Sequence, residues 1–365
     1  MYPALFEPFQ LKSLRLRNRI AMAPMTRSFS PGGVPGLNVA DYYRRRAEGG
    51  AGLILSEGTV VDRPASGNDP AVPRFYGKDA LNGWNAVIGA VHGAGGAMAP
   101  QLWHAGVIAP HASGWLPDAP FEGPSGLETP DKTGGIAMEK DSIEKTVKAF
   151  ASAAGSAQEL GFDAIEIHAA HGYLIDQFFW SMLNRRGDVY GGAMIDSRSR
   201  FAVEIVKAIR EAVGDDFPVI MRISQFKQQD YTAKIAEHPK ELELWLQPLA
   251  EAGVDMFHCS QRRVCEPEFP NSDLNLAGWV KRVTGQPTIA VGSVGLSNDL
   301  LSSFAGECSS STPIEEAVER LARGDFDILA VGRAFLANPE WPNLMKKGAF
   351  DEILPFSSSM LSELY

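Results

Sequence analysis

The sequence predicts a single closed (β/α)8 barrel, an α/β fold in which parallel strands alternate with helices. Its 365 residues suit a barrel with long loops. Eight short, mostly apolar runs recur along the chain, and each is followed by a loop and a helical pattern. An unbroken series of strand-then-helix units favours one closed barrel over two domains, so residues 1–365 are expected to form one domain.

The eight runs are bounded by Gly, Pro or Asp and are mostly apolar throughout, which is typical of buried parallel strands. In chain order they are residues 19–25, 52–58, 98–104, 163–169, 218–224, 255–260, 287–293 and 327–332. Helical patterns follow at residues 38–48, 79–92, 142–160, 197–213, 240–252, 275–284, 312–323 and 339–347. In the third helix, Val147, Phe150, Ala151 and Ala154 are expected to share the apolar face.

Two helix starts carry recognisable capping residues. Asn38 is expected to be the N-cap of the first helix. Thr312, Pro313 and Glu315 follow the order of a capping box, with Thr at the N-cap, Pro at the first helical position and Glu at the third. We therefore expect the first helix to begin after Asn38 and the seventh to begin after Thr312.

An open, doubly wound sheet is the competing architecture. It usually has fewer strands and a glycine-rich loop that binds a dinucleotide. The sequence contains no G-x-G-x-x-G and no G-x-x-x-x-G-K-[ST] motif, which weakens both a Rossmann and a P-loop interpretation.

Composition limits the partners and the compartment. The formal net charge of −10 argues against nucleic-acid partners, and the one basic run, residues 44–46, is expected to form a solvated helix face. No apolar run reaches the roughly 18 residues of a membrane helix, and the start lacks the pattern of a secretory signal. Cys259, Cys265 and Cys308 have no C-x-x-C spacing, so we expect no zinc or iron–sulfur site and a cytoplasmic location.

The functional site is expected at the carboxyl ends of the strands, because barrel enzymes build it from the loops there. Three of those loops are long, at residues 105–139, 225–239 and 260–275. Trp103 at a strand end and Phe269 in the third long loop are candidate walls of a substrate pocket.

A phosphate site is expected after the last two strands, where barrels commonly bind phosphate. The run of Gly292, Ser293, Val294 and Gly295 would let backbone N–H groups approach an anion closely, and Arg333 could add a bidentate contact. The alternative is that these glycines only form tight turns.

Three other strand ends suit a flavin ring. Gln101 can both donate and accept in one plane, Arg222 supplies a permanent positive charge, and Thr26 can donate its hydroxyl to a ring carbonyl. Taken alone, a strand-end Gln is more often a structural bridge.

His168, His171 and Tyr173 lie at and just past the fourth strand, and three interpretations stay open. The histidines could bind a metal, although no third ligand has suitable spacing. They could instead donate from neutral imidazoles to a substrate oxygen while Tyr173 acts as a general acid. His168 could also be a satisfied core histidine. Glu166 shares a face with His168 and is expected to pair with a basic group.

Five segments resemble one known family. They are residues 18–27 (NRIAMAPMTR), 101–106 (QLWHAG), 168–178 (HAAHGYLIDQF), 184–192 (NRRGDVYGG) and 331–339 (VGRAFLANP). In this order they look like the old yellow enzyme family of FMN-dependent ene-reductases, and the resemblance covers essentially the whole chain. Gly187 departs from the pattern, because the family usually has Thr at this place.

The resemblance implies a cofactor, a set of site residues and a cycle. FMN would be bound by Ala23, Pro24, Met25, Thr26, Gly58, Gln101 and Arg222, with its phosphate on Gly292, Ser293, Gly332 and Arg333. His168 and His171 would bind the substrate's carbonyl or nitro oxygen, and Tyr173 would protonate Cα while reduced flavin delivers hydride to Cβ. NADPH or NADH would reduce the flavin in the same pocket, a ping-pong cycle.

The resemblance also implies that the partners are small electron-poor alkenes and NAD(P)H, with no nucleic acid or membrane, and that the protein is a monomer or homodimer. Two other functions compete: a metal-dependent barrel hydrolase using His168 and His171, and a flavin-binding protein without turnover. Dihydroorotate-type FMN barrels are a further alternative, but they lack the His-x-x-His-Gly-Tyr arrangement.

Overall fold

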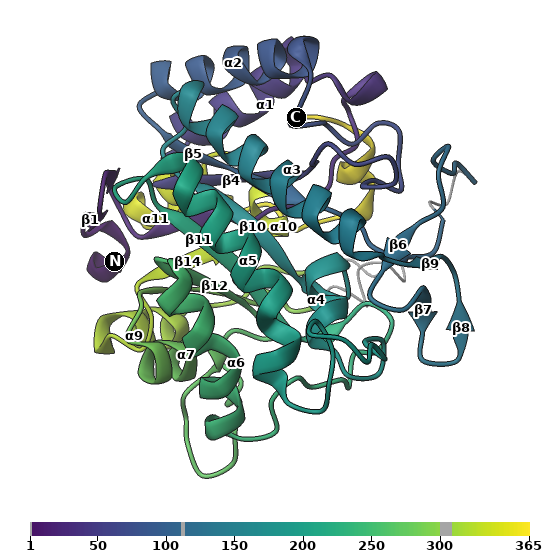
Figure 1. Cartoon of the computed structure of the whole chain (residues 1–365). Helices are drawn as coiled ribbons and strands as arrows, with labels where there is room; N and C mark the ends of the chain where they lie inside the picture. The colour runs from purple at the N-terminus through teal and green to yellow at the C-terminus, as the bar shows by residue number, and fades with distance from the viewer. Residues whose placement is uncertain (1, 111–113, 300–308) are drawn as a thin grey trace.

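Eight parallel strands form a closed barrel in the computed structural model, which describes residues 2–110, 114–299 and 309–365 (Figure 1). Around the barrel the order is β10, β11, β12, β13, β14, β3, β4 and β5. Their bounds are β3 Ile20–Met22, β4 Leu53–Val60, β5 Ala97–Trp103, β10 Ile165–His171, β11 Val219–Lys227, β12 Met256–Ser260, β13 Thr288–Val291 and β14 Ile328–Val331. Each predicted strand overlaps one of these eight, which confirms the barrel.

Helices surround the barrel, each antiparallel to the strand it follows. They are α1 Leu37–Glu48, α2 Lys78–Gly93, α3 Lys140–Glu159, α5 Ile195–Val213, α6 Pro239–Ala252, α7 Leu276–Thr284, α9 Glu315–Arg323 and α11 Trp341–Lys347. Two shorter helices, α4 Leu174–Phe179 and α10 Arg333–Ala337, lie at the carboxyl ends of β10 and β14. Short 3-10 helices occur at Pro3–Phe6, Pro31–Gly33, Phe350–Glu352 and Ser358–Ser362.

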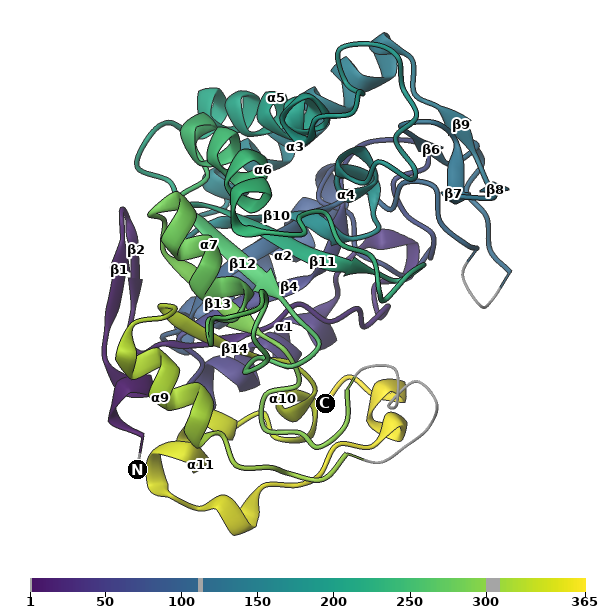
Figure 2. The same ribbon diagram turned by 90° about the horizontal axis from the view of Figure 1, so that it is seen from below.

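A hairpin of β1 (Phe9–Leu11) and β2 (Leu14–Leu16) covers the amino end of the barrel. Leu14 and Leu16 are buried against the inward-facing apolar residues of the barrel strands, including Ile220 and Met256. Figure 2 shows this hairpin at the end opposite the excursion after β5. The sequence analysis did not predict the hairpin, because its strands are only three residues long.

The loop after β5 forms two small sheets at the carboxyl end of the barrel. In the first, β6 (Glu122–Gly123) pairs parallel with β9 (Ile136–Ala137), and in the second β7 (Leu127–Thr129) pairs antiparallel with β8 (Lys132–Thr133). This excursion is the predicted long loop at residues 105–139, and it extends away from the barrel in Figure 1.

Both predicted helix starts are wrong. Helix α1 begins at Leu37 with Gly36 as its N-cap, because the Gly36 carbonyl already accepts from Val39 and Ala40. Helix α9 begins at Glu315, because the Thr312 N–H donates to the Gly295 carbonyl and holds the chain in an extended conformation there.

In α3, Phe150 and Ala154 are buried as expected, and half-buried Val147 packs against the same apolar core, so these three share the predicted face; Ala151 is half-buried. One surface prediction needs correction. In the basic run of α1, Arg46 is fully buried. Its guanidinium lies 3.7 Å from the centre of the Tyr42 ring and donates to the carbonyls of Tyr42 and Phe335, so this part of the run is no solvated face.

Two of the three cysteines belong to the described residues. Cys259 is buried and Cys265 is half-buried, and both are free thiols. Cys308 lies outside the described residues. Within the described ranges, no helix combines the length and the apolar character that a membrane span requires.

Candidate active site

Polar side chains face inward near the carboxyl end of the barrel. Gln101, Glu166, Arg222 and His258 come from the neighbouring strands β5, β10, β11 and β12, and all are buried. Because alternate residues of a strand face the same side, these four lie directly above the apolar layer that the hairpin covers. The predicted flavin residues Gln101 and Arg222 are therefore in one inner layer with Glu166.

The carboxylate of Glu166 joins this group together. Its Oε1 accepts from Gln101 Nε2 at 2.7 Å, and its Oε2 lies 2.6 Å from His258 Nδ1. Burial lowers the pKa of His258, although the Glu166 charge opposes that shift. His258 is the basic partner that was predicted for Glu166 without being identified. The sequence contained a signal for this pairing: His258 is two residues after Met256 in an apolar strand, so both side chains lie on the same face.

Arg222 is a buried cation with free hydrogen-bonding capacity. Burial lowers the pKa of its guanidinium, and the charge of Glu166 raises it again. Its Nε atom is buried and has no hydrogen-bond partner in the described part of the chain, and the same holds for Trp103 Nε1. Buried donors of this kind are costly unless a partner satisfies them, so these two are available to a bound group.

The two predicted histidines and the tyrosine form one cluster. The ring centres of His168 and His171 are 5.3 Å apart, and those of His168 and Tyr173 are 4.8 Å apart. Trp103 meets Tyr173 edge-on at 5.0 Å, so it forms a wall of the same cluster. Phe226, the second-last residue of β11, lies 5.2 Å from His171 on another side.

Protonation in this cluster follows from burial. The pKa of His168, which is buried, and that of His171, which is half-buried, lie well below the ordinary value, because desolvation disfavours the charged form and the Arg222 charge opposes a second positive charge. Burial raises the pKa of the Tyr173 hydroxyl. At neutral pH the site therefore contains two neutral imidazoles and a protonated phenol.

The contacts of each imidazole bear on its tautomer. His168 Nδ1 accepts from the Ala170 N–H at 3.4 Å, which leaves the ring proton of the neutral form on Nε2. His171 Nε2 lies 2.9 Å from Ser260 Oγ, at the end of β12.

The residues predicted for one face of a flavin lie at the ends of β3 and β4. The Ala23 N–H donates to the Val331 carbonyl, and a Cβ at Gly332 would lie 3.6 Å from Met25 Sδ, so Met25 is next to Gly332. Thr26 is exposed. Gly58 is opposite Gln101, and a Cβ at Gly58 would lie 3.3 Å from the Trp103 ring.

Glu57 fixes the chain just after Thr26. Its buried Oε2 accepts from the N–H groups of Arg27 and Ser28 at 2.8 and 3.0 Å. Burial raises the pKa of Glu57 to about 7, although those hydrogen bonds oppose the shift.

The predicted phosphate residues come together after β13 and β14. Arg333 Nη2 donates to Ser293 Oγ at 3.2 Å, and Ser293 has a positive φ of 47°. A Cβ at Gly292 would lie 2.7 Å from the Gln261 carbonyl oxygen, so this glycine is required by the close approach of a neighbouring loop.

Phe269 does not join the cluster. Its ring packs edge-on against Trp279 of α7, with Lys234 above it, and it belongs to the core between the barrel and its helices. Trp103 and Tyr173 belong to a different apolar cluster.

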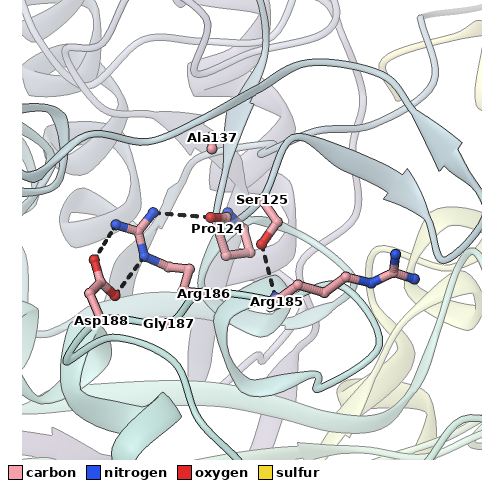
Figure 3. Close-up of a pocket in the computed structure, with 7 residues that line it drawn as sticks. All are labelled: Pro124, Ser125, Ala137, Arg185, Arg186, Gly187 and Asp188. Atoms are coloured by element: carbon pink, nitrogen blue, oxygen red, sulfur yellow. Dashed lines mark hydrogen bonds and ion pairs between the residues drawn. The ribbon is translucent and has the colours of Figure 1, made fainter.

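A surface pocket of about 340 Å³ lies outside the cluster, between the excursion after β5 and residues 185–188 (Figure 3). Arg186 donates there to the carbonyls of Pro124 and Met138 and to both carboxylate oxygens of Asp188. The guanidinium of Arg186 is therefore already hydrogen-bonded within the protein, and it holds the excursion against residues 185–188. Within the described ranges, no three His, Cys, Asp or Glu side chains gather as a metal site.

Known proteins of similar sequence are flavin oxidoreductases and related reductases. Residues 4–352 match the family described as "NADH:flavin oxidoreductase / NADH oxidase family". The 12-oxophytodienoate reductase 7 of Oryza sativa subsp. japonica is 34% identical over 92% of this chain and 86% of its own length. An NADH oxidase of Thermoanaerobacter brockii is also 34% identical, over 96% of this chain, which spans about half (52%) of that protein.

Solved structures agree with this family. Morphinone reductase in complex with tetrahydroNAD has a TM-score of 0.79 and 30% identity, over 98% of this chain and 93% of that one. The old yellow enzyme homologue from Zymomonas mobilis also has a TM-score of 0.79, with 26% identity over 98% and 96% of the two chains. The chain therefore belongs to the NADH:flavin oxidoreductase, or old yellow enzyme, family and is an FMN-dependent NAD(P)H oxidoreductase.

Proposed function

We propose that this enzyme is an ene-reductase that acts on small electron-poor alkenes, such as α,β-unsaturated carbonyl and nitro compounds. The observation that carries the proposal is the cluster of two neutral imidazoles and one protonated phenol beside Arg222. The relatives named above as reductases support the direction of the reaction. The acting unit would be the single barrel domain of residues 1–365, as a monomer or homodimer.

The buried polar atoms of the barrel fit FMN. Arg222, with its unpartnered Nε, would neutralise negative charge on the ring, and Gln101 would bind the polar edge of the ring with its amide. Ala23, Pro24, Met25, Thr26 and Gly58 would border the ring, and Gly292, Ser293, Gly332 and Arg333 would bind the phosphate. When bound and reduced by NADPH or NADH, FMN supplies the hydride.

His168 and His171 would bind the oxygen of the substrate. A neutral imidazole keeps an N–H that can donate, and His168 would have its proton on Nε2, since Nδ1 faces the Ala170 N–H at 3.4 Å. Two such donors stabilise the negative charge that develops on a carbonyl or nitro oxygen when hydride reaches Cβ. Trp103 would limit the pocket on the side of Tyr173.

Tyr173 would supply the proton for Cα. Burial keeps its pKa above the ordinary value, so the hydroxyl carries its proton throughout the neutral range. General acids of this kind contribute about 10²- to 10⁴-fold to rate.

The test is to replace Tyr173 by Phe and measure both half-reactions by anaerobic stopped-flow absorbance. We expect flavin reduction by NADPH to stay close to the wild-type rate, while reoxidation by 2-cyclohexenone slows about 10²- to 10⁴-fold. Tyr231→Phe is the matched control, because Tyr231 stacks on Phe226 through its ring and should keep both rates. Equal loss in both half-reactions of Tyr173→Phe would contradict the proton-donor role.

A further inference from the structure

Two oppositely charged side chains are fully buried behind the His171 turn, and the proposed cycle uses neither of them. Lys227 Nζ at the end of β11 lies 2.7 Å from Asp176 Oδ1 in α4, and both side chains have 0% exposure. Burying an ion pair costs several kcal/mol per ion in desolvation, so such a pair is a weak source of stability. Its position therefore needs another explanation.

The turn beside this pair has an unfavourable backbone conformation. His171 has φ of +64° and Gly172 has φ of +81°. The strand register changes at the same place: Ala169 is opposite Ile223, but His171 is opposite Lys227, so β11 has two additional residues. A non-glycine residue with such a φ costs about 1–3 kcal/mol and persists only when its surroundings hold it.

Lys227 and Asp176 hold the backbone of this turn directly and through one neighbour. Asp176 Oδ2 accepts from the Gly172 N–H at 2.6 Å. Lys227 Nζ donates to the Ser224 carbonyl at 3.3 Å, and Ser224 Oγ accepts from the His171 N–H at 2.9 Å. The N–H groups of His171 and Gly172 therefore end on the ion pair or on a residue bonded to it.

The charge of Lys227 also acts on His171. The largest cause of the low pKa of His171 is burial, and the charges of Arg222, His168 and Lys227 lower it further. Lys227 thus favours the neutral form of His171 that donates to substrate oxygen, while Asp176 keeps the lysine charge tolerable in the interior.

We propose that Lys227 and Asp176 are a positioning pair, which holds the His171–Gly172–Tyr173 turn so that His171 and Tyr173 face the substrate. The inference rests on the proposed function of those two residues, and it adds that their placement depends on an ion pair outside the substrate pocket. Gln229 supports the same turn, since its Nε2 donates to the Gly172 carbonyl at 3.2 Å.

The test compares Lys227→Met, Asp176→Asn and the double variant with wild type, all loaded with FMN. The probe is para-hydroxybenzaldehyde, whose phenolate oxygen would bind the histidines, and its dissociation constant is read from the change in flavin absorption well below the melting temperature. We expect each single variant to bind the phenol about tenfold more weakly or worse, a loss of roughly 1.4 kcal/mol. KM for 2-cyclohexenone should rise with it, while the FMN content of the folded protein stays at one per chain.

The double variant separates positioning from simple stabilisation. Without either charge, the interior no longer contains an unpaired ion, so the melting temperature should recover towards wild type. The phenol should still bind weakly, because no ammonium group then holds Ser224. If Lys227→Met does not fold, this variant carries the test alone.

Lys281→Met is the matched control. It removes a Lys–Asp pair, with Nζ 3.0 Å from Asp327 Oδ1, at the opposite end of the barrel, and it should leave phenol affinity unchanged. Wild-type affinity in the Lys227 and Asp176 variants, within twofold, would overturn the positioning role. A wild-type enzyme that binds no phenol and reduces no enone would instead overturn the proposed function itself.

Discussion

The two ends of the barrel interior are built by the same strands but have opposite chemistry. At the amino end, Ile220 of β11 and Met256 of β12 pack beneath the β1–β2 hairpin in an apolar layer. Two residues further along the same strands, Arg222 and His258 occupy the same inward side as a polar layer. Because side chains alternate with a period of two, one step along the inner face separates the apolar layer that stabilises the fold from the polar layer that we propose binds the cofactor.

The polar layer is stable in the interior to the extent that its buried groups have hydrogen-bond partners. The apolar layer needs only to exclude water, whereas each polar group above it needs a partner. Glu166 provides two of those partnerships at once, to Gln101 and to His258. The donors left over, such as Arg222 Nε, are the ones available for a ligand. Substitutions confined to one layer test whether the two layers have these separate roles.

The largest effect is expected when the centre of the polar layer is removed. Glu166→Leu leaves Gln101 Nε2 and His258 Nδ1 without an acceptor and removes the negative charge near Arg222. We expect the free energy of unfolding to fall by about 3–5 kcal/mol in urea titrations. Glu166→Gln keeps an oxygen acceptor and should lose much less. Equal stability of the two variants would contradict the role given to this carboxylate.

The next effect concerns pH. Glu57 has a pKa of about 7 when folded against 4.5 ordinarily, because it is buried. Between these values the folded chain holds a proton that the unfolded chain has released, so the free energy of unfolding falls as pH rises. The protonated Glu57 stabilises the folded chain at low pH, and this stabilisation, about 3 kcal/mol, is lost as the pH rises from 4.5 to 7. Above that window Glu57 makes no further change to the free energy of unfolding. Glu57→Gln cannot titrate, so the stability difference between wild type and variant should change with pH; a flat difference from pH 4.5 to 7 would refute the shift.

A smaller effect is expected for ligand binding. His168→Ala removes one donor to a phenolate oxygen and should raise the dissociation constant of para-hydroxybenzaldehyde about 10- to 100-fold, by flavin absorption. His171→Ala should behave in the same way. Phe269→Leu is the control, because Phe269 packs against Trp279 outside the cluster and should leave the affinity unchanged. Wild-type affinity in both histidine variants would remove them from the substrate site.

The smallest effect is expected in the apolar layer. Ile220→Val removes one buried methylene group and should lower the free energy of unfolding by about 0.5–1.5 kcal/mol. Phenol affinity and FMN content should not change, since the loss is confined to the amino end of the barrel. A change in phenol affinity beyond twofold would show that the two layers are coupled.

The sequence predicts the barrel well because buried parallel strands leave a strong local signal. Every predicted strand overlaps an observed one, and the strand ends bring His168, His171 and Tyr173 into one cluster. The prediction of a helix start fails where a contact with a distant part of the chain overrides the local sequence pattern. Thr312 resembles an N-cap, yet its N–H is used by Gly295.

The interior polar partners could not be read from the sequence for a related reason. Lys227 and Asp176 are far apart in the chain and each looks like an ordinary surface residue of a loop or helix. The two-residue register change between β10 and β11 places Lys227 opposite His171, and Asp176 of α4 meets it in the interior. Phe269 illustrates the reverse error, since a loop at the correct end of the barrel does not require each aromatic residue in it to face the site.

The central claim is that the polar end of the barrel reduces electron-poor alkenes. The most direct measurement is an anaerobic visible spectrum of the FMN-loaded protein, taken before NADPH, after NADPH and again after 2-cyclohexenone. We expect the flavin band to bleach with NADPH and to return when the enone is added. A band that bleaches and stays bleached, with a range of enones and nitroalkenes, would contradict the claim.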